Sequence, residues 1–291
     1  MRILVTGGTG QVGIELQRLR WPDGVQIDAP AREGLDLCEP ETVSAYLARH
    51  EIAAVIHCAA YTAVDKAESE IAAAWRVNAL VPAALAQATR AANVAIVHVS
   101  TDYVFDGSKN TPYETHDAVR PLGVYGASKE GGEQAIRTGN PRHVIVRTSW
   151  VVSAHRANFV KTMLRLAVER PVLRVVADQQ GRLTSAADLA AALQLIALRH
   201  ARDAAAPRGT WHFANAGECV WADISAAIMA DNARRGKPAA RIERISTSEY
   251  PTPARRPANS RLSTASLEAD WGIVPRDWRV ALRDILDELA A

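Results

Sequence analysis

The feature that most constrains the fold is a cluster of glycines near the start of the chain. An apolar, strand-like run over Arg2 to Thr6 leads directly into the spacing Gly7-x-x-Gly10-x-x-Gly13, and a helix-like segment begins at Gln11. Glycine tolerates positive φ and lets backbone N–H groups approach a phosphate, while the N-terminus of the next helix offers unpaired donors. An ordinary tight turn is the alternative. The flanking strand and helix favour a dinucleotide site in which all three glycines lie near the phosphates.

Strand-like and helix-like segments alternate over the first half of the chain. The expected strands are short β-branched runs at Arg2 to Thr6, Val25 to Ile27, Ala53 to Cys58, Val94 to Ser100 and Val144 to Thr148. The expected helices are Gln11 to Leu19, Glu41 to Arg49, Ala67 to Ala92 and Ser128 to Arg137. Strands that are apolar on both faces suit a buried parallel sheet. The order predicts an α/β fold with a doubly wound parallel sheet of the Rossmann type.

The alternation loosens in the second half of the chain, where helix-like segments outnumber strands. A proline-rich stretch over Tyr250 to Pro257 predicts an ordered loop or lid, because proline restricts itself and the residue before it. We expect a dinucleotide-binding domain over residues 1–150, with return segments within 173–240. A smaller α/β substrate-binding lobe is expected mainly from residues 151–172 and 241–291.

Charge, cysteine content and hydropathy exclude several classes of protein. The 34 Lys and Arg residues against 32 Asp and Glu leave a formal charge of +2, too weak a field to collect nucleic acid or membrane headgroups. Three cysteines without C-x-x-C spacing give neither a disulfide framework nor a zinc ribbon. No run of about 18 apolar residues and no signal-peptide core is present. We expect a cytoplasmic protein that binds neither nucleic acid nor membrane.

Two side chains compete for the adenosine ribose of the expected dinucleotide. At the end of the second strand of such a fold, a carboxylate reads the ribose hydroxyls of NAD, or an arginine accepts the 2′-phosphate of NADP. Asp28 lies at the strand end and Arg32 follows four residues later. We expect NADPH, with NADH as the alternative.

A tyrosine and a lysine four residues apart suggest a proton-transfer group. Tyr125 and Lys129 would share one face of a helix, and Thr101 follows a strand expected to end at the ligand-binding edge of the sheet. Reduction of a ketone needs a proton as hydride arrives. We expect the ammonium to lower the pKa of Tyr125, and the Thr101 hydroxyl to bond the substrate oxygen.

These motifs, together with several longer blocks, resemble one family of the extended short-chain dehydrogenases, the dTDP-4-dehydrorhamnose reductases. The glycine turn, the Thr101 hydroxyl and the Tyr125-x-x-x-Lys129 pair are general to the wider group. The blocks that narrow the resemblance are Gly7 to Gln17, Ala59 to Glu70, Ser100 to Gly107, Arg147 to Val151, Asn158 to Leu164 and Arg256 to Leu262. They cover nearly the whole chain.

The resemblance implies contacts for the phosphate and adenine parts of the cofactor. Gly10, Gln11 and Val12 would contact the phosphates. Asp36 and Leu37 would contact the adenine.

The nicotinamide is expected beside the proton-transfer group. Ala60, Tyr61 and Thr62 would line its side. In this family the residue matching Tyr125 donates the proton, and the one matching Lys129 binds the nicotinamide ribose and tunes the tyrosine.

The same likeness places the sugar nucleotide. Thr101 would position the ketone, and Asp102 and Trp150 would help to hold the substrate. Arg256, with its neighbour Arg255, would reach the diphosphate, because guanidinium is a natural bidentate partner for phosphate oxygens.

The implied enzyme is an NAD(P)H-dependent oxidoreductase that converts dTDP-4-dehydro-L-rhamnose to dTDP-L-rhamnose, a nucleotide-sugar precursor of cell-surface polysaccharides such as lipopolysaccharide. A homodimer is the expected assembly.

Two alternative functions stay open. One is an epimerase or dehydratase that acts on another nucleotide sugar and holds NAD⁺ tightly. The other is a non-catalytic module like the regulatory subunit of methionine adenosyltransferase.

One departure from the family concerns a metal. Some relatives hold Mg²⁺ between carboxylates of paired subunits, one of them at the position of Glu15, but the second position is Ala187 in this chain. Because Mg²⁺ requires oxygen ligands, we do not expect the same metal site. Arg182 and Leu183 also replace the usual Ala-Pro of the neighbouring loop.

Overall fold

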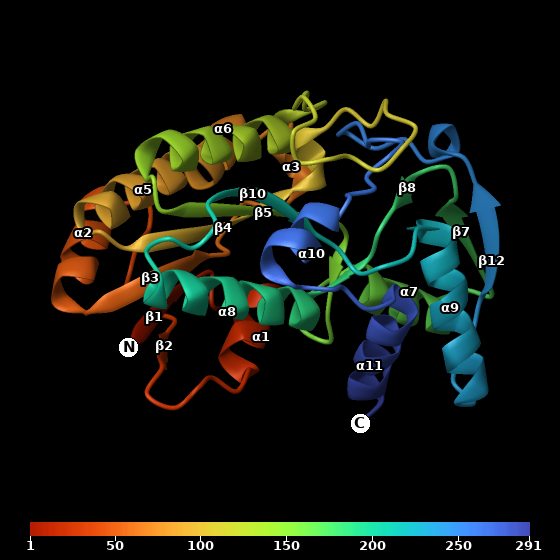
Figure 1. The fold of residues 1–291 in the computed structure, drawn as a ribbon. Coiled ribbons are helices and arrows are strands. Elements are labelled where there is room, and N and C mark those ends of the chain that lie inside the picture. Colours follow the sequence, from red (N-terminus) through yellow and green to blue (C-terminus); the bar gives the residue numbers. More distant parts are fainter.

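A six-stranded parallel sheet forms the centre of the computed structural model, which describes residues 1–291 (Figure 1). The strands, in spatial order, are β2 (Gln26–Asp28), β1 (Arg2–Thr6), β3 (Ile52–His57), β4 (Ala95–Thr101), β5 (His143–Thr148) and β10 (Gly209–Phe213). All neighbouring strands run parallel, so their carboxyl ends meet at one edge. The chain order reverses at β1, between β2 and β3. Ligands of such sheets bind outside this switch point.

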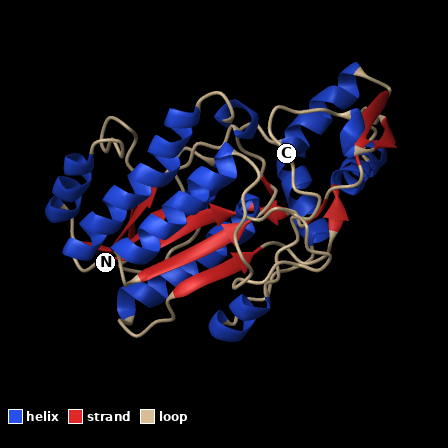
Figure 2. Ribbon diagram, turned by 90° about the horizontal axis from the view of Figure 1, so that it is seen from above, coloured by secondary structure: helices blue, strands red, loops and turns tan.

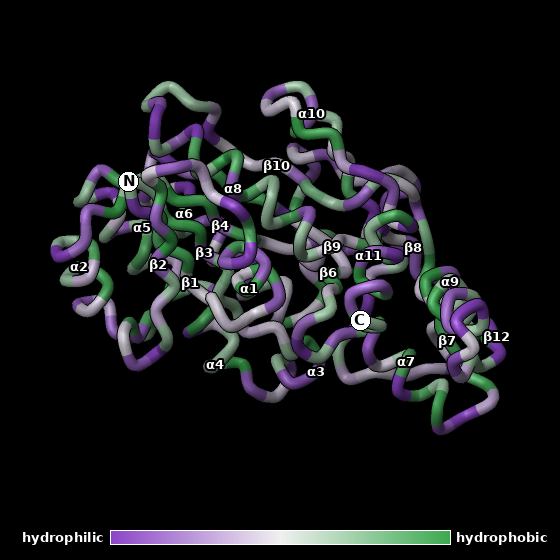
Figure 3. Tube along the Cα trace, turned by 90° about the horizontal axis from the view of Figure 1, so that it is seen from below, coloured by the Kyte–Doolittle hydropathy of each residue, from purple (hydrophilic) through white to green (hydrophobic).

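Helices cover both faces of the sheet, which confirms the doubly wound α/β fold (Figure 2). One face is covered by α1 (Gln11–Arg18) and α8 (Ala186–Arg202), through residues such as Leu16 and Leu193. The other is covered by α2 (Pro40–Arg49), α5 (Val81–Ala91) and α6 (Val124–Gly139). Between the sheet and these three helices, apolar residues concentrate around β3 and β4 (Figure 3). The strands are apolar on both faces because both faces are buried.

The expected single helix over 67–92 is divided in the structure. It is made of α3 (Val64–Ala67), α4 (Ile71–Trp75), a π-helical turn η1 (Arg76–Leu80) and then α5. Pro82 has no N–H to donate to the Asn78 carbonyl four residues earlier, so the regular ladder cannot continue through this point. A Cβ at Gly132 of α6 would overlap the same carbonyl oxygen, which explains why α6 carries a glycine there.

A second, smaller lobe packs around its own core beyond the sheet (Figure 1). Its elements are β7 (Val172–Val176), β12 (Arg241–Ile245), α7 (Phe159–Glu169), α9 (Trp221–Arg234) and α11 (Trp278–Ala290). Strands β7 and β12 pair in parallel, and residues such as Val160, Ile228 and Leu282 fill the space between them and the helices.

The remaining elements are short. They are β6 (Val151–Val152), β8 (Gln180–Gly181), β9 (Thr184–Ser185), β11 (Cys219–Val220), the 3₁₀ turns η2 (Asp102–Val104) and η3 (Thr247–Glu249), and α10 (Ala265–Trp271). Although α10 lies within residues 241–291, its Leu267 and Trp271 pack in the core that includes the sheet. No helix combines the length and apolar character that crossing a bilayer requires.

Candidate active site

The glycine turn after β1 lies at the switch point of the sheet. Gly7 has φ +77°, and a Cβ there would stand 2.6 Å from the Ala59 nitrogen of the loop that follows β3. A Cβ at Gly13 would overlap the Gly7 carbonyl oxygen, so α1 packs onto the turn only because this residue is glycine. Gly10 caps α1 without a side-chain hydrogen bond, which leaves the first helix amides open to an anion.

The Gln11 side chain forms hydrogen bonds with residues after β6. Its Oε1 accepts hydrogen bonds from Ser153 Oγ at 3.0 Å and from Asn158 Nδ2 at 3.1 Å. Gln11 and Val12 therefore offer a phosphate their backbone amides at the start of α1, while the Gln11 side chain ties the turn to the segment after β5.

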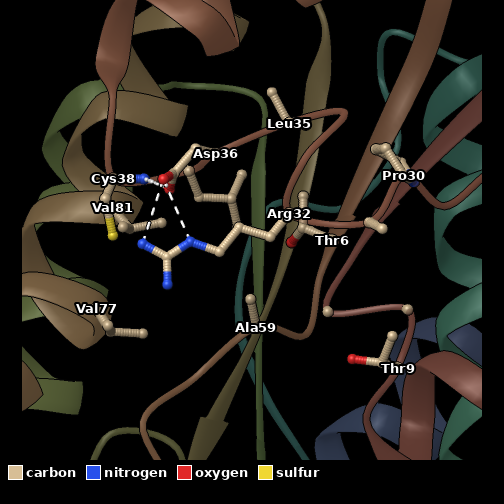
Figure 4. A pocket seen from close by; sticks show the side chains of 14 residues that line it. Thr6, Thr9, Pro30, Arg32, Leu35, Asp36, Cys38, Ala59, Val77 and Val81 are labelled. Carbon is tan, nitrogen blue, oxygen red and sulfur yellow. Dashed lines mark hydrogen bonds and ion pairs between the residues drawn. The ribbon is translucent and has the colours of Figure 1, made fainter.

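A cavity of about 220 Å³ opens beside this turn (Figure 4). Four of the residues expected to bind the cofactor line it: Gly7, Arg32, Asp36 and Leu37. Arg32 donates from Nε and Nη2 to Asp36 Oδ2, both at 3.2 Å. Asp36 Oδ1 accepts from the Cys38 backbone N–H at 2.9 Å. The Cys38 N–H and the Arg32 guanidinium together hold the pKa of Asp36 below its usual range.

Asp28 does not face this cavity. Its Oδ2 accepts a hydrogen bond from the Tyr46 hydroxyl of α2 at 2.5 Å. Of the two candidates for binding the adenosine ribose, Asp28 and Arg32, Arg32 is therefore the one that lines the cavity. The apolar part of the lining was missed, because no spacing marks it: Pro30, Ala31, Leu35, Val77 and Val81.

The loop after β3 carries Ala60, Tyr61 and Thr62, and Asn78 of the π-helical turn braces it. Asn78 Oδ1 accepts from Tyr61 N at 2.8 Å, while Nδ2 donates to Tyr61 O at 3.1 Å and to Ser128 Oγ at 3.0 Å. A buried asparagine thus fixes the loop against α6, the helix that carries Tyr125.

The expected proton-transfer residues gather at the carboxyl end of β4. Tyr125 lies in the first turn of α6, and its ring meets Tyr103 edge-on, with centroids 5.4 Å apart. Thr101 Oγ1 donates to Asp102 Oδ1 at 3.0 Å. Burial raises the pKa of Tyr125 to about 12, although the nearby Thr101 hydroxyl opposes the shift.

The expectation that Lys129 lowers the pKa of Tyr125 is therefore wrong for this structure. Lys129 is buried beside β4, where Nζ donates to the Val99 carbonyl oxygen at 2.7 Å. Burial lowers the pKa of Lys129 itself to about 8. The ammonium is held by the sheet, and burial dominates the titration of the phenol.

Asp102 gives a pH-dependent prediction. It is buried, its Oδ2 has no hydrogen-bond partner, and burial raises its pKa from 3.8 to about 6. The folded protein therefore favours the neutral acid more than the unfolded chain does. As the pH rises from about 4 through 6 and Asp102 ionises, the free energy of unfolding falls by at most about 3 kcal/mol. We expect Asp102→Asn to unfold a few degrees above the unmodified protein at pH about 8. Thermal unfolding should show the difference vanish near pH 4, and a difference that is equal at both pH values would contradict this account.

Arg256 lies at the rim of this group but is already paired. Its Nη2 donates to Asp65 Oδ2 of α3 at 2.8 Å, and its guanidinium lies 6.0 Å from the Tyr103 ring centroid. Nη1 is buried without a partner. Asp65, which also accepts from Ala254 N at 3.2 Å, had no expected role beyond its place in the block Ala59 to Glu70. Trp150 follows β5 and stacks on Trp221 of the second lobe.

A separate cluster surrounds Glu15 of α1. Its acidic and imidazole groups, from Glu15, His155 and Glu288, come within 4.8 Å of one another. The Arg18 guanidinium is among them, 2.6 Å from Glu288 Oε1 and 2.7 Å from His155 Nε2. Mg²⁺ prefers oxygen ligands, whereas this set includes an imidazole nitrogen and a resident cation. The donor set is not that of a Mg²⁺ site within one chain.

Relatives among known proteins match this chain over nearly its whole length. The family model described as the RmlD substrate binding domain matches residues 1–291. The dTDP-4-dehydrorhamnose reductase of Sinorhizobium fredii is 43% identical over 98% of this chain and 97% of its own length. A crystal structure of a dTDP-4-dehydrorhamnose reductase from Clostridium acetobutylicum has a TM-score of 0.93 and 35% identity, covering 100% of both chains. That of the Bacillus anthracis enzyme in complex with NADP has a TM-score of 0.92 and 32% identity, covering 99% of both. The chain therefore belongs to the RmlD substrate-binding-domain family, as its sequence motifs had indicated.

Proposed function

We propose that this protein is an NADPH-dependent reductase that converts dTDP-4-dehydro-L-rhamnose to dTDP-L-rhamnose. One juxtaposition carries the proposal. The glycine turn after β1 and the Thr101–Tyr125 group after β4 lie at the same edge of one parallel sheet, with only β3 between the two strands. Neighbouring strands are about 4.8 Å apart, so one extended dinucleotide can reach both groups. The names of the relatives supply the substrate.

Each part of the site has a role in this proposal. The turn residues Gly7, Gly10 and Gly13, with the amides of Gln11 and Val12, bind the diphosphate at the start of α1. The cavity around Arg32, Asp36 and Leu37 takes the adenosine end, and Ala60, Tyr61 and Thr62 lie along the nicotinamide side. NADPH supplies the hydride when it is bound.

Residues of this chain supply the rest of the chemistry. Tyr125 transfers its phenolic proton to the 4-keto oxygen, and Thr101 donates a second hydrogen bond to that oxygen. With its raised pKa, the Tyr125 phenol carries its proton at neutral pH, as a proton donor must. Lys129 bonds the nicotinamide ribose. Asp102, Trp150 and the free Nη1 of Arg256 hold the sugar nucleotide.

The decisive experiment follows NADPH absorbance with enzymatically prepared dTDP-4-dehydro-L-rhamnose. Stoichiometric oxidation of NADPH, with dTDP-L-rhamnose as product, is the expected result. Turnover of a nucleotide sugar without net loss of NADPH would identify an epimerase or dehydratase instead. No turnover, with co-purification of a synthetase subunit, would identify a regulatory module. A homodimer and a cytoplasmic location stay predictions from the sequence.

The choice of NADPH over NADH gives a second prediction. Because Arg32 lies in the cavity and Asp28 is bound to Tyr46, Arg32→Ala should raise KM for NADPH about tenfold and leave KM for NADH nearly unchanged. Asp28→Asn is the matched comparison and should not change the ratio of the two KM values. Equal effects of Arg32→Ala on both cofactors would show that Arg32 does not read the 2′-phosphate.

A further inference from the structure

Trp150 has a backbone conformation that bulky side chains rarely adopt. Its φ is +49°, in the left-handed region, at the point where the chain leaves β5. Such conformations are unfavourable unless the surroundings fix them, and they cluster at functional sites. The preceding strand ends at Thr148, which pairs with Thr101 across the sheet. The strained residue is therefore two positions from the partner of a proposed catalytic residue.

The Trp150 indole packs against two neighbours, Trp221 and Gly181. Its ring stacks on that of Trp221, with centroids 3.9 Å apart and planes 18° from parallel. Gly181 also lies against the ring, since an added Cβ there would overlap three atoms of the indole. The Trp150 carbonyl oxygen accepts from Thr184 N at 3.2 Å, which pins the backbone as well.

Trp221 belongs to a different part of the chain and is itself supported. It is the first residue of α9, and its ring also meets Phe159 of α7, with centroids 4.5 Å apart. The second lobe therefore determines where the side chain after β5 points. Because of this packing, the position of the second lobe affects the position of Trp150 at the proposed substrate site.

We propose that Trp221 is a positioning residue that, together with Gly181, fixes the Trp150 indole at the nucleotide-sugar site. The inference rests on the proposed function, in which Trp150 contacts the substrate. Trp221 acts on substrate binding only through Trp150. The Trp150–Trp221 stack contains no residue of the proposed cofactor site.

Substrate kinetics test the role of Trp221. Trp221→Leu removes the stacking ring and keeps an apolar side chain, so KM for dTDP-4-dehydro-L-rhamnose should rise about tenfold. The Kd of NADPH should stay the same and kcat should change far less than KM. Trp221→Phe keeps an aromatic face and should restore most of the affinity.

A double-variant cycle separates positioning from general packing. If Trp221 acts through Trp150, then Trp221→Leu should cause no further rise in KM in a Trp150→Leu background. The same rise in both backgrounds would overturn the proposal, because Trp221 would then act by another route.

A spectroscopic readout reports the stack directly. Close indoles couple their electronic transitions, so the far-ultraviolet circular dichroism of the unmodified protein should carry an exciton band from this pair. Trp221→Leu and Trp150→Leu should both remove that band and leave the contribution of the Trp211–Trp271 pair, whose centroids are 5.5 Å apart. Trp75→Leu is the matched control, because Trp75 of α4 is 40% exposed and has no stacking partner. That variant should keep both the band and KM.

Gly181→Ala provides a test that keeps both indoles. The added methyl group must displace Trp150, so KM should rise and the exciton band should change even if Trp221→Leu fails to fold. Normal KM in Gly181→Ala with an altered band would overturn the proposal. Failure of the unmodified protein to reduce the ketone would instead refute the proposed function, so the two failures are distinguishable.

Discussion

Tyr125→Phe should lower kcat for ketone reduction about a thousandfold and leave the Kd of NADPH almost unchanged. General acid catalysis contributes roughly 10²–10⁴-fold to rate, and the variant removes only the proton that Tyr125 donates. The aromatic ring remains, so its edge-on packing against Tyr103 should persist. Steady-state turnover and cofactor fluorescence titration measure the two quantities separately.

Tyr46→Phe is the control for this change. It also removes one tyrosine hydroxyl, but that hydroxyl binds Asp28 outside the cofactor cavity. Its kcat should remain within a few-fold of the unmodified enzyme. If Tyr125→Phe retained full turnover, another group would have to deliver the proton, and the assignment of Tyr125 would fail.

The parts of the site that sequence could predict are those encoded within a few residues. The glycine turn predicts its own conformation because only glycine fits at Gly7 and Gly13. Tyr125 and Lys129 share a helix face because they are four residues apart. Both follow from local geometry, and the parallel sheet then brings the separate loops to one edge.

The parts that sequence could not predict depend on residues far apart in the chain. The choice between Asp28 and Arg32 depends on Tyr46, eighteen residues after Asp28, which binds the aspartate. The Arg256 partner, Asp65, lies 191 residues away. The pKa of Tyr125 follows from its burial, which the pair spacing does not encode. Each outcome requires the folded positions of several elements.

Glu133 links the stability of the fold to the proposed catalytic helix. It lies four residues after Lys129 on α6 and is fully buried. Arg147 of β5 donates two hydrogen bonds to its carboxylate, from Nε to Oε1 at 2.8 Å and from Nη2 to Oε2 at 2.7 Å. Burial favours the neutral acid, but the Arg147 guanidinium outweighs it and holds the pKa of Glu133 below its usual range. This contribution to stability is present at neutral pH and is lost as the pH falls through the lowered pKa.

Glu133→Gln should therefore lower the free energy of unfolding by about 3–5 kcal/mol at neutral pH, because Arg147 is left as a buried, uncompensated charge. The expected fall in Tm is about 10 °C. Glu130→Gln is the matched control on the same helix, where Glu130 Oε1 only accepts an exposed hydrogen bond from Gln134, and it should stay within about 0.5 kcal/mol. Replacing both partners, as in Glu133→Leu with Arg147→Met, should recover part of the loss. The buried charge of Arg147 is removed, and Arg137, which also pairs with Glu133 Oε2, is partly exposed to water. Denaturant unfolding at neutral pH measures all four proteins. A double variant less stable than Glu133→Gln would show that packing, and not the unpaired charge, controls this contact.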